Sequence, residues 1–410
     1  MSTQSRPAAV VLPWIVALFF IWGGLTSLND VLIPKLKAMF ELNYAQAMLT
    51  QFAFFAAYLL VSLPSGAYVA RRGYLAGMLT GLALMAVGCL LFVPAVALHE
   101  YTAFLFALFV LASGITLLQV AANPFISQLG SSETSHSRLT LAQAFNSLGT
   151  TLFPPIGAWL LFGPGTSSAQ QSADSHVISI AYAAIALALV GVILVLLRFR
   201  TVLPHTSGPQ LQMRGAAALL RIPRLGGAVT SVFLYVGAEV AIGSILVSFL
   251  MQSDVMAIDA RSAGQLLAFY WGGAMAGRFA GAWILRRFLP GNVLATFALA
   301  AAALVMCAVL SSGSIAGWAL LAVGLANSIM FPTLFSLGIE GLGDETSRAS
   351  GLLCMAIVGG AIIPLLLGLI ADRSGIQASL LLPFACYVAI AAYGWMARRP
   401  ATTTAKSALS

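Results

Sequence analysis

Twelve long apolar runs follow one another along this chain and constrain its fold more than any motif does. The hydrocarbon core of a bilayer is about 30 Å thick, and a helix needs about 20 apolar residues to cross it. Strands of a membrane barrel would instead alternate in polarity over about ten residues. The runs lie at 9–32, 46–70, 74–93, 101–128, 138–162, 177–197, 225–251, 262–285, 291–311, 315–340, 347–370 and 375–396. The sequence therefore predicts an all-α integral membrane protein with twelve transmembrane helices.

Charge is scarce, and its placement predicts the orientation of the helices. Only 8% of the residues are charged, against about 25% in soluble domains. Lys and Arg collect in the cytoplasmic loops of membrane proteins, and most of the 20 such residues share one side when the N-terminus is placed inside. Both termini are therefore expected in the cytoplasm. The net charge of +8 is scattered over these loops, so no nucleic-acid partner is expected.

The residue types that carry catalysis or bind metals show no functional spacing. The four cysteines lie inside apolar runs without a Cys-x-x-Cys pattern. Three of the four histidines, His136, His176 and His205, fall in expected loops. We therefore expect a protein that is not an enzyme and that has no metal site and no cofactor.

An internal repeat divides the chain into two halves. The longest polar interruption predicts a cytoplasmic linker at 198–224, between bundles at 1–197 and 225–410. Six helices per half is an even number, so the two copies share one orientation and form a parallel repeat, with the substrate site expected between the bundles near the midplane. The repeat pairs Gly66 with Gly281, Arg71-Arg72 with Arg286-Arg287, Pro124 with Pro332, Arg138 with Arg348, Gly149 with Gly359 and Pro154 with Pro364.

Five motifs, spread over both halves, carry a family resemblance. They are Leu28-Asn29-Asp30, Ala121-Ala122-Asn123-Pro124-Phe125, Leu141-Ala142-Gln143-Ala144-Phe145-Asn146-Ser147, Tyr235-Val236-Gly237-Ala238-Glu239 and Phe331-Pro332-Thr333. With them the chain resembles the major facilitator superfamily, and within it the fucose permease and glucose/galactose permease group. The resemblance implies the major facilitator fold and ion-driven monosaccharide uptake across a bacterial inner (plasma) membrane. One departure is Ala70, at the acidic position of the family's loop after the second helix.

Polar and aromatic residues within the apolar runs are candidate sugar contacts. A sugar offers hydroxyl groups to amides and carboxylates, and apolar faces to aromatic rings. Of the amides, Asn123, Gln143 and Asn146 match family positions, whereas the alternative for any single amide is an interhelical hydrogen bond worth about 0.6 kcal/mol. The candidate substrate-binding residues are Trp22, Asn29, Asp30, Gln51, Gln119, Asn123, Gln143, Asn146, Glu239, Tyr270, Trp271 and Asn327.

Two carboxylates are candidates for ion coupling. A carboxylate in a membrane segment costs about 2.5 to 3.5 kcal/mol on insertion scales, so its default interpretation is functional. The resemblance implies a proton-accepting glutamate in the fucose branch at the position of Gln119, which cannot titrate. We therefore expect Asp30 or Glu239 to bind the coupling H⁺ or Na⁺; the alternative for Glu239 is a structural carboxyl group. Arg278 and Glu340, near cytoplasmic helix ends, are interpreted as gate or packing residues.

These features together predict a symporter that imports a hexose-type monosaccharide by alternating access and acts as a monomer in the lipid bilayer. Gln119 and the Gly237-Ala238-Glu239 string favour glucose or galactose. The alternatives are a fucose or N-acetylglucosamine symporter, or a drug or metabolite exporter of the same fold.

Overall fold

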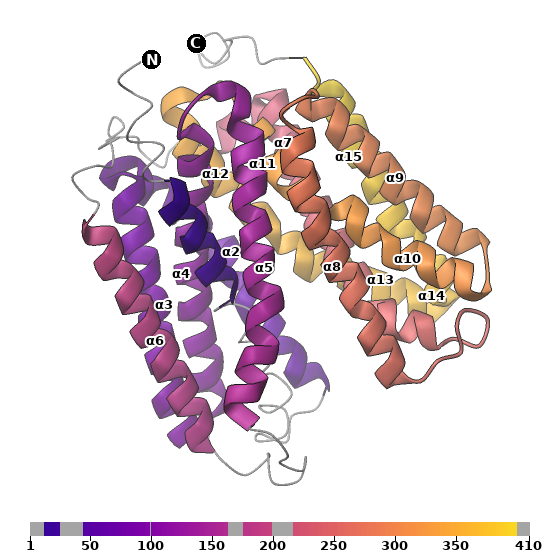
Figure 1. Cartoon of the computed structure of the whole chain (residues 1–410), viewed down its shortest axis with the longest axis horizontal. Helices are drawn as coiled ribbons and strands as arrows, with labels where there is room; N and C mark the ends of the chain where they lie inside the picture. The colour runs from indigo at the N-terminus through magenta and orange to yellow at the C-terminus, as the bar shows by residue number, and fades with distance from the viewer. Residues whose placement is uncertain (1–11, 25–43, 99, 163–174, 199–215, 400–410) are drawn as a thin grey trace. The chain divides into compact units, whose positions relative to one another are not determined.

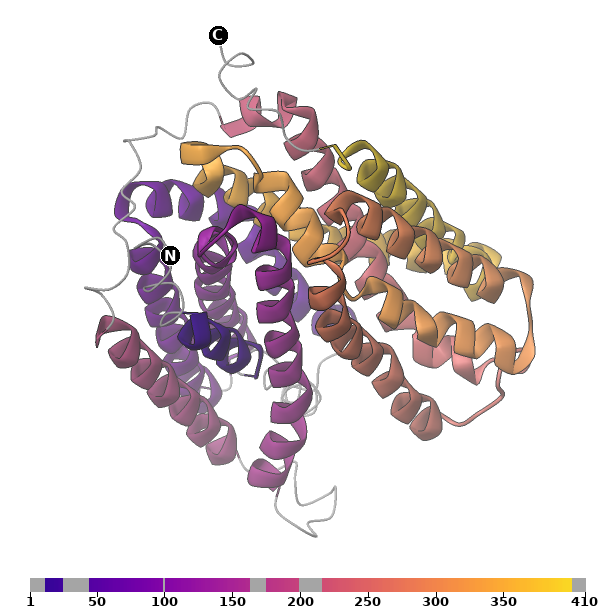
Figure 2. The same cartoon turned by 45° about the horizontal axis from the view of Figure 1, so that its top comes forward.

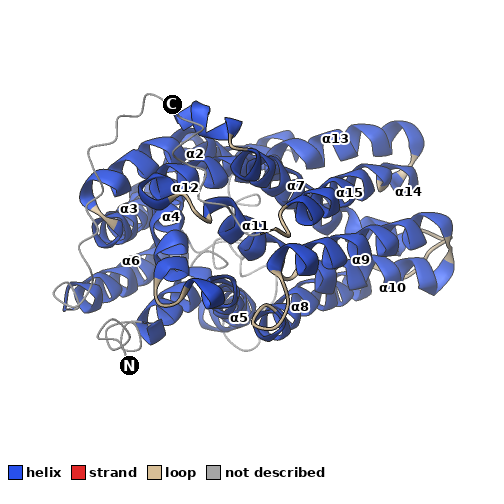
Figure 3. Cartoon of the chain, turned by 90° about the horizontal axis from the view of Figure 1, so that it is seen from above, coloured by secondary structure: helices blue, strands red, loops and turns tan. Residues whose placement is uncertain are grey.

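Every regular element that the structure describes is a helix. The structure is a computed structural model and describes residues 12–24, 44–98, 100–162, 175–198 and 216–399 (Figure 3). Each of the twelve apolar runs is mainly helical over its described part, which confirms the all-α prediction. Eight helical stretches in these ranges are long and apolar enough to cross a membrane, and two more are apolar but shorter.

The helices of the first half follow the predicted runs closely (Figure 1). A short 3-10 helix, η1 (Ser132–Thr134), precedes α5. The apolar helices are Leu12–Gly24, α2 (Tyr44–Arg72), α3 (Tyr74–Ala97), α4 (Tyr101–Gln128), α5 (Ser135–Phe162) and α6 (Ser175–Arg198).

The last three predicted runs of the second half are interrupted. In the run 315–340, α10 ends at Asn327 and α11 begins at Met330. Pro332 explains this break, because proline has no N–H to bond the carbonyl of Ser328 four residues earlier. The helices are α7 (Pro223–Met251), α8 (Ala260–Ile284), α9 (Pro290–Leu310), α10 (Gly313–Asn327), α11 (Met330–Ile339), α12 (Thr346–Met355), α13 (Gly359–Ser374), α14 (Ile376–Ser379) and α15 (Leu381–Met396), with 3-10 turns η2 (Ala216–Arg221), η3 (Gly343–Glu345) and η4 (Ala356–Val358).

Contacts between the helices group the chain into two compact units. The first unit contains Met1–Gly130, Phe145–Arg214 and Ser350–Met355; the second contains Ser131–Ala144, Gly215–Ala349 and Ala356–Ser410. The start of α5 therefore packs with the second unit, and the rest of α5 packs with the first. The predicted division into 1–197, a linker at 198–224 and 225–410 stays a prediction.

In the first unit, α4 packs against both α2 and α3, and α6 covers α3 (Figure 1). Most of α4 is buried. The helices α3 and α4 come so close that a Cβ built on Gly114 would lie 2.5 Å from the backbone nitrogen of Met85 and 2.6 Å from the carbonyl oxygen of Gly81. Small residues that let backbones approach in this way are typical of helix packing in membranes.

In the second unit, α7 is central and contacts α8, α10, α11, α13 and α15. The helices α9 and α15 lie side by side (Figure 2). Two glycines bring helices into backbone contact, since a Cβ on Gly324 would lie 2.0 Å from the carbonyl oxygen of Tyr270, and one on Gly359 would lie 2.0 Å from that of Phe233. The approach at Gly324 brings α10 onto α8 beside the residues described next.

We predict that Gly114→Ala lowers the melting temperature of the detergent-solubilised protein, because the added methyl group forces α3 and α4 apart. Gly191→Ala is the matched control, since nothing lies within 4 Å of a Cβ at that helical position. Alanine is favoured over glycine in a helix by about 1 kcal/mol, so the control should melt at the same temperature or higher. Equal melting of the two variants would contradict the close approach at Gly114.

Candidate functional site

A hydrogen-bonded network in the second unit surrounds Glu239. Tyr235 lies one helical turn before it on α7 and donates from its hydroxyl to Glu239 Oε1 at 2.7 Å. Tyr270 on α8 donates to the backbone carbonyl of Glu239 at 3.2 Å. Asn327, the last residue of α10, donates from Nδ2 to the Tyr270 hydroxyl at 2.9 Å. Both tyrosines and Asn327 are buried, whereas Glu239 is partly exposed. The buried residues of the network therefore hold a partly exposed carboxylate in place.

The break between α10 and α11 supplies backbone groups to the same network. Arg278 of α8 donates from Nε to the Ser328 carbonyl at 3.1 Å, the acceptor that Pro332 cannot satisfy. Tyr235 also lies within hydrogen-bond distance of the Asn327 carbonyl, at 3.2 Å. The charge of Arg278 acts on Glu239 electrostatically. The arrangement connects the candidate carboxylate directly to a helix break.

An exposed indole ring lies next to this network. Trp271 follows Tyr270 on α8, and the two ring centroids are 5.0 Å apart in an edge-to-face arrangement. The ring of Trp271 packs beside Gly243, one turn after Glu239 on α7, where a Cβ would lie 3.1 Å from it. Trp271 is 45% exposed. Trp271 therefore packs against α7 one helical turn after Glu239. A carboxylate can bond the hydroxyl groups of a sugar, and an exposed aromatic ring can pack against its apolar face.

The amide residues of the first unit have different surroundings. Gln119 and Asn123 lie one turn apart on α4; Asn123 is fully buried, and the side-chain oxygen of Gln119 is buried without a hydrogen-bond partner among the described residues. Asn146 on α5 donates to the Phe19 carbonyl at 3.0 Å. Trp22 is buried and packs against Phe19, with ring centroids 5.3 Å apart. Asn146 therefore holds the helix Leu12–Gly24 against α5, whereas Trp22 packs within that helix.

Three predicted site residues have no described side chain, and the α5 residue Gln143 belongs to the second unit rather than to the first. Asn29 and Asp30 lie outside the described residues, and Gln51 lies in α2 but its side chain is not described. Gln143 on α5 is buried and belongs to the second unit. The role of Asp30 in ion coupling therefore stays a prediction.

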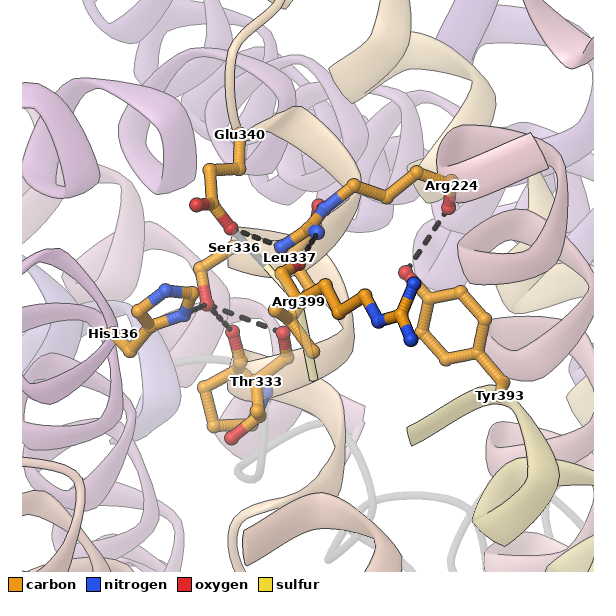
Figure 4. Close-up of polar contacts among 9 residues, drawn as sticks. His136, Arg224, Thr333, Ser336, Leu337, Glu340, Tyr393 and Arg399 are labelled. Carbon is orange, nitrogen blue, oxygen red and sulfur yellow. Dashed lines mark hydrogen bonds and ion pairs between the residues drawn. The ribbon is translucent and has the colours of Figure 1, made fainter. Parts of the chain in front are cut away.

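A second polar cluster of the second unit is centred on Arg224, at the start of α7 (Figure 4). Its guanidinium forms an ion pair with Glu340 and donates to the carbonyls of Leu337 at 3.0 Å and Arg399 at 2.8 Å. Tyr393 of α15 donates to the Arg224 carbonyl at 3.0 Å. Glu340, which we interpreted from the sequence as a gate or packing residue, thus links the end of α11 to the start of α7, and Arg224 extends this link to the chain that follows α15. Arg224 was not singled out from the sequence.

His136 belongs to the same part of the molecule, although the sequence analysis placed it in a loop. It is buried in the first turn of α5, before the apolar run, and its Nδ1 lies 2.6 Å from the Ser336 hydroxyl (Figure 4). Ser336 donates its proton to the Pro332 carbonyl at 2.7 Å, so Nδ1 of His136 is the donor to Ser336. Burial, and then the charges of Arg224 and Arg138, lower the pKa of His136 to about 4.

Comparisons with known proteins agree on one family. The family model described as "Major Facilitator Superfamily" matches residues 14–362. A protein named "Glucose/galactose transporter" from Brucella abortus biovar 1 (strain 9-941) is 47% identical over 395 residues, covering 96% of this chain and 95% of that protein. The "L-fucose-proton symporter" of Escherichia coli (strain K12) is 35% identical, covering 94% of this chain and 93% of that protein.

Solved structures show the same similarity. The crystal structure of a Major Facilitator Superfamily transporter, FucP, in the outward conformation matches with a TM-score of 0.86. The two sequences are 32% identical, and the match covers 97% of this chain and 100% of that chain.

We predict that acid destabilises the protein through His136. Between the ordinary pKa of 6.5 and the folded value of about 4, the unfolded chain binds more protons than the folded one, so the free energy of unfolding falls as pH drops through this window. The full loss is about 3 kcal/mol. Thermal unfolding in detergent should show a smaller acid-induced decrease for His136→Asn than for the wild type. Ser336→Ala keeps the imidazole and should keep the decrease; an equal acid effect in all three proteins would contradict the assignment.

Proposed function

The chain belongs to the Major Facilitator Superfamily and has its fold, and we propose that it imports a hexose-type monosaccharide by cation symport through alternating access. The observation that carries this proposal is Glu239, a partly exposed carboxylate in the middle of α7 with the exposed ring of Trp271 one turn away. The Brucella abortus relative, named a glucose/galactose transporter, supports a sugar as substrate.

Glucose or galactose is favoured over fucose. The relatives named for glucose and galactose, from Brucella abortus and Helicobacter pylori, are 47% and 40% identical, against 35% for the fucose-proton symporter. Gln119 also replaces the glutamate that the resemblance implies for the fucose branch. Fucose and N-acetylglucosamine are the alternative sugars. A drug exporter of the same fold is less well supported, because Glu239 and its network offer polar groups to a substrate.

We propose that the coupling ion is H⁺ and that Glu239, with Asp30, is the group that binds it. The relatives named as fucose-proton symporters support a proton. A carboxylate in a membrane segment can bind and release a proton or, with neighbouring oxygens, hold Na⁺, so Na⁺ is the alternative to test.

The sugar contacts that we propose divide into two kinds. Glu239, Gln119, Asn123 and Gln143 would bond hydroxyl groups, and Trp271 would pack against an apolar sugar face. Tyr270 and Asn327 are buried next to Glu239 and would keep it in position, as Asn146 would position the helix Leu12–Gly24. We propose that the monomer is the transporting form and that both termini lie in the cytoplasm.

Counterflow in proteoliposomes identifies the substrate. With a panel of radiolabelled sugars we expect exchange of glucose or galactose, and weaker exchange in Trp271→Ala, because the ring that packs on the sugar is lost. Trp283→Ala is the control, since Trp283 is an exposed indole on the same helix. If no monosaccharide exchanges in the wild type, the proposed function is wrong.

Uptake driven by one gradient at a time identifies the coupling ion. We expect a proton gradient alone to drive accumulation and a sodium gradient alone to have no effect. Glu239→Gln should exchange sugar in counterflow but lose accumulation, because the amide keeps the shape of the side chain and cannot titrate. Asp30→Asn, tested in parallel, decides which carboxylate carries the proton. Accumulation that survives both substitutions would contradict the coupling proposal.

A further inference from the structure

The hydroxyl group of Tyr235 has one proton and two acceptors. Glu239 Oε1 lies 2.7 Å from it and the Asn327 carbonyl oxygen lies 3.2 Å from it. Tyr235 is buried, with 1% of its surface exposed, so water does not supply a second donor there. The two acceptors therefore compete for a single proton.

The two acceptors belong to different parts of the second unit. Glu239 Oε1 is the partly exposed candidate ion-binding group on α7, whereas the Asn327 carbonyl ends α10 at the break before α11. Proline-associated breaks are places where helices bend. If the Tyr235 hydroxyl changes its acceptor from Glu239 to Asn327, the ionisation of Glu239 affects the hydrogen bonding of the break between α10 and α11.

The direction of the competition follows from charge. Hydrogen bonds to ionised acceptors are shorter and about twice as strong as neutral ones. Ionised Glu239 therefore holds the Tyr235 proton, which agrees with the shorter of the two distances. When Glu239 binds a proton it becomes neutral, and its hydrogen bond with the Tyr235 hydroxyl weakens. The main-chain carbonyl of Asn327 then becomes the better acceptor.

The other charged and titratable groups near Glu239 leave this competition in place. Arg278 on α8 acts on Glu239 through its charge, but its Nε is bonded to the Ser328 carbonyl. Tyr270 donates to the Glu239 backbone rather than to the carboxylate. Tyr387 on α15 lies near both Asn327 and Glu239. Among the described residues, Tyr235 lies within hydrogen-bond distance of both the carboxylate and a main-chain carbonyl at the break.

We propose that Tyr235 is a positioning residue that transmits the protonation of Glu239 to the break between α10 and α11. No bond other than hydrogen bonds changes in this step: one proton from water binds the carboxylate, and the Tyr235 hydroxyl turns from Oε1 to the Asn327 carbonyl. This inference rests on the proposed function for its use in transport, but the relay itself requires no sugar.

Transport of Tyr235→Phe tests the use of the relay. Phenylalanine keeps the ring and removes only the hydroxyl. We expect counterflow close to that of the wild type and a loss of proton-driven accumulation of at least about fivefold, the lower end of typical coupling between two sites. Tyr68→Phe, which removes a hydrogen bond to Thr80 in the first unit, should change neither. Loss of counterflow in proportion to accumulation, or full accumulation in Tyr235→Phe, would overturn the proposal.

Hydrogen exchange tests the relay without sugar. In nanodiscs, the amides of peptides that span 325–331 should exchange more slowly at acidic than at alkaline pH after correction for the intrinsic rate. Neutral Glu239 leaves Tyr235 to the Asn327 carbonyl, and this bond stabilises the break against the local opening that permits exchange. Tyr235→Phe and Glu239→Gln should each lose this pH dependence, and Tyr68→Phe should keep it. If the wild-type peptides show no pH dependence, the relay is wrong even where sugar transport is intact. If the relay is seen and no sugar exchanges, the proposed function fails by itself.

Discussion

The requirement that every backbone polar group find a partner inside the membrane governs the second unit. Lipid offers no hydrogen bonds, and an unsatisfied group in it costs several kcal/mol. Pro332 leaves the Ser328 carbonyl without its helical donor, and Arg278 supplies that donor instead. The partly buried guanidinium of Arg278 in turn gains from a compensating charge, which Glu239 provides nearby. The break, the arginine and the carboxylate therefore depend on one another. Tyr235 donates to the carboxylate or to the Asn327 carbonyl, and Tyr270 donates to the backbone carbonyl of Glu239.

Close helix packing is the second condition for this network. Asn327 can donate to Tyr270 because α10 approaches α8 until Gly324 touches the Tyr270 carbonyl. A side chain at position 324 would separate these helices and remove the bond. Gly324 acts through its missing Cβ, and its contribution to the site is indirect. It lets Asn327 reach the Tyr270 hydroxyl, and Tyr270 in turn bonds the backbone of Glu239.

The apolar runs predicted the helices well because membrane helices are long and uniformly apolar, which leaves little ambiguity. The breaks at 328–329 and at Leu380 were missed, since uniform hydrophobicity does not show where a helix stops; Pro332 was noted only as part of the repeat and of a family motif. Glu239 was found because a membrane carboxylate is costly. Tyr235 and Arg224 were not assigned roles, because their partners Asn327 and Glu340 lie 92 and 116 residues away and no local pattern predicts such pairs. His136 was placed in a loop because it lies between the apolar runs 101–128 and 138–162, and its partner Ser336, 200 residues distant, leaves no local signal.

The position of Glu239 among the described acids is the reason why we propose it as the coupling group. The other acidic residues that the structure describes lie in loops, in 3-10 turns or within the last residues of a helix, as Glu133, Glu340 and Asp372 do. Gln119, within α4, is in the right place but has no ionisable group. A proton bound at Glu239 instead changes the charge beside a helix break, where the same hydrogen bonds that satisfy the backbone are available to respond.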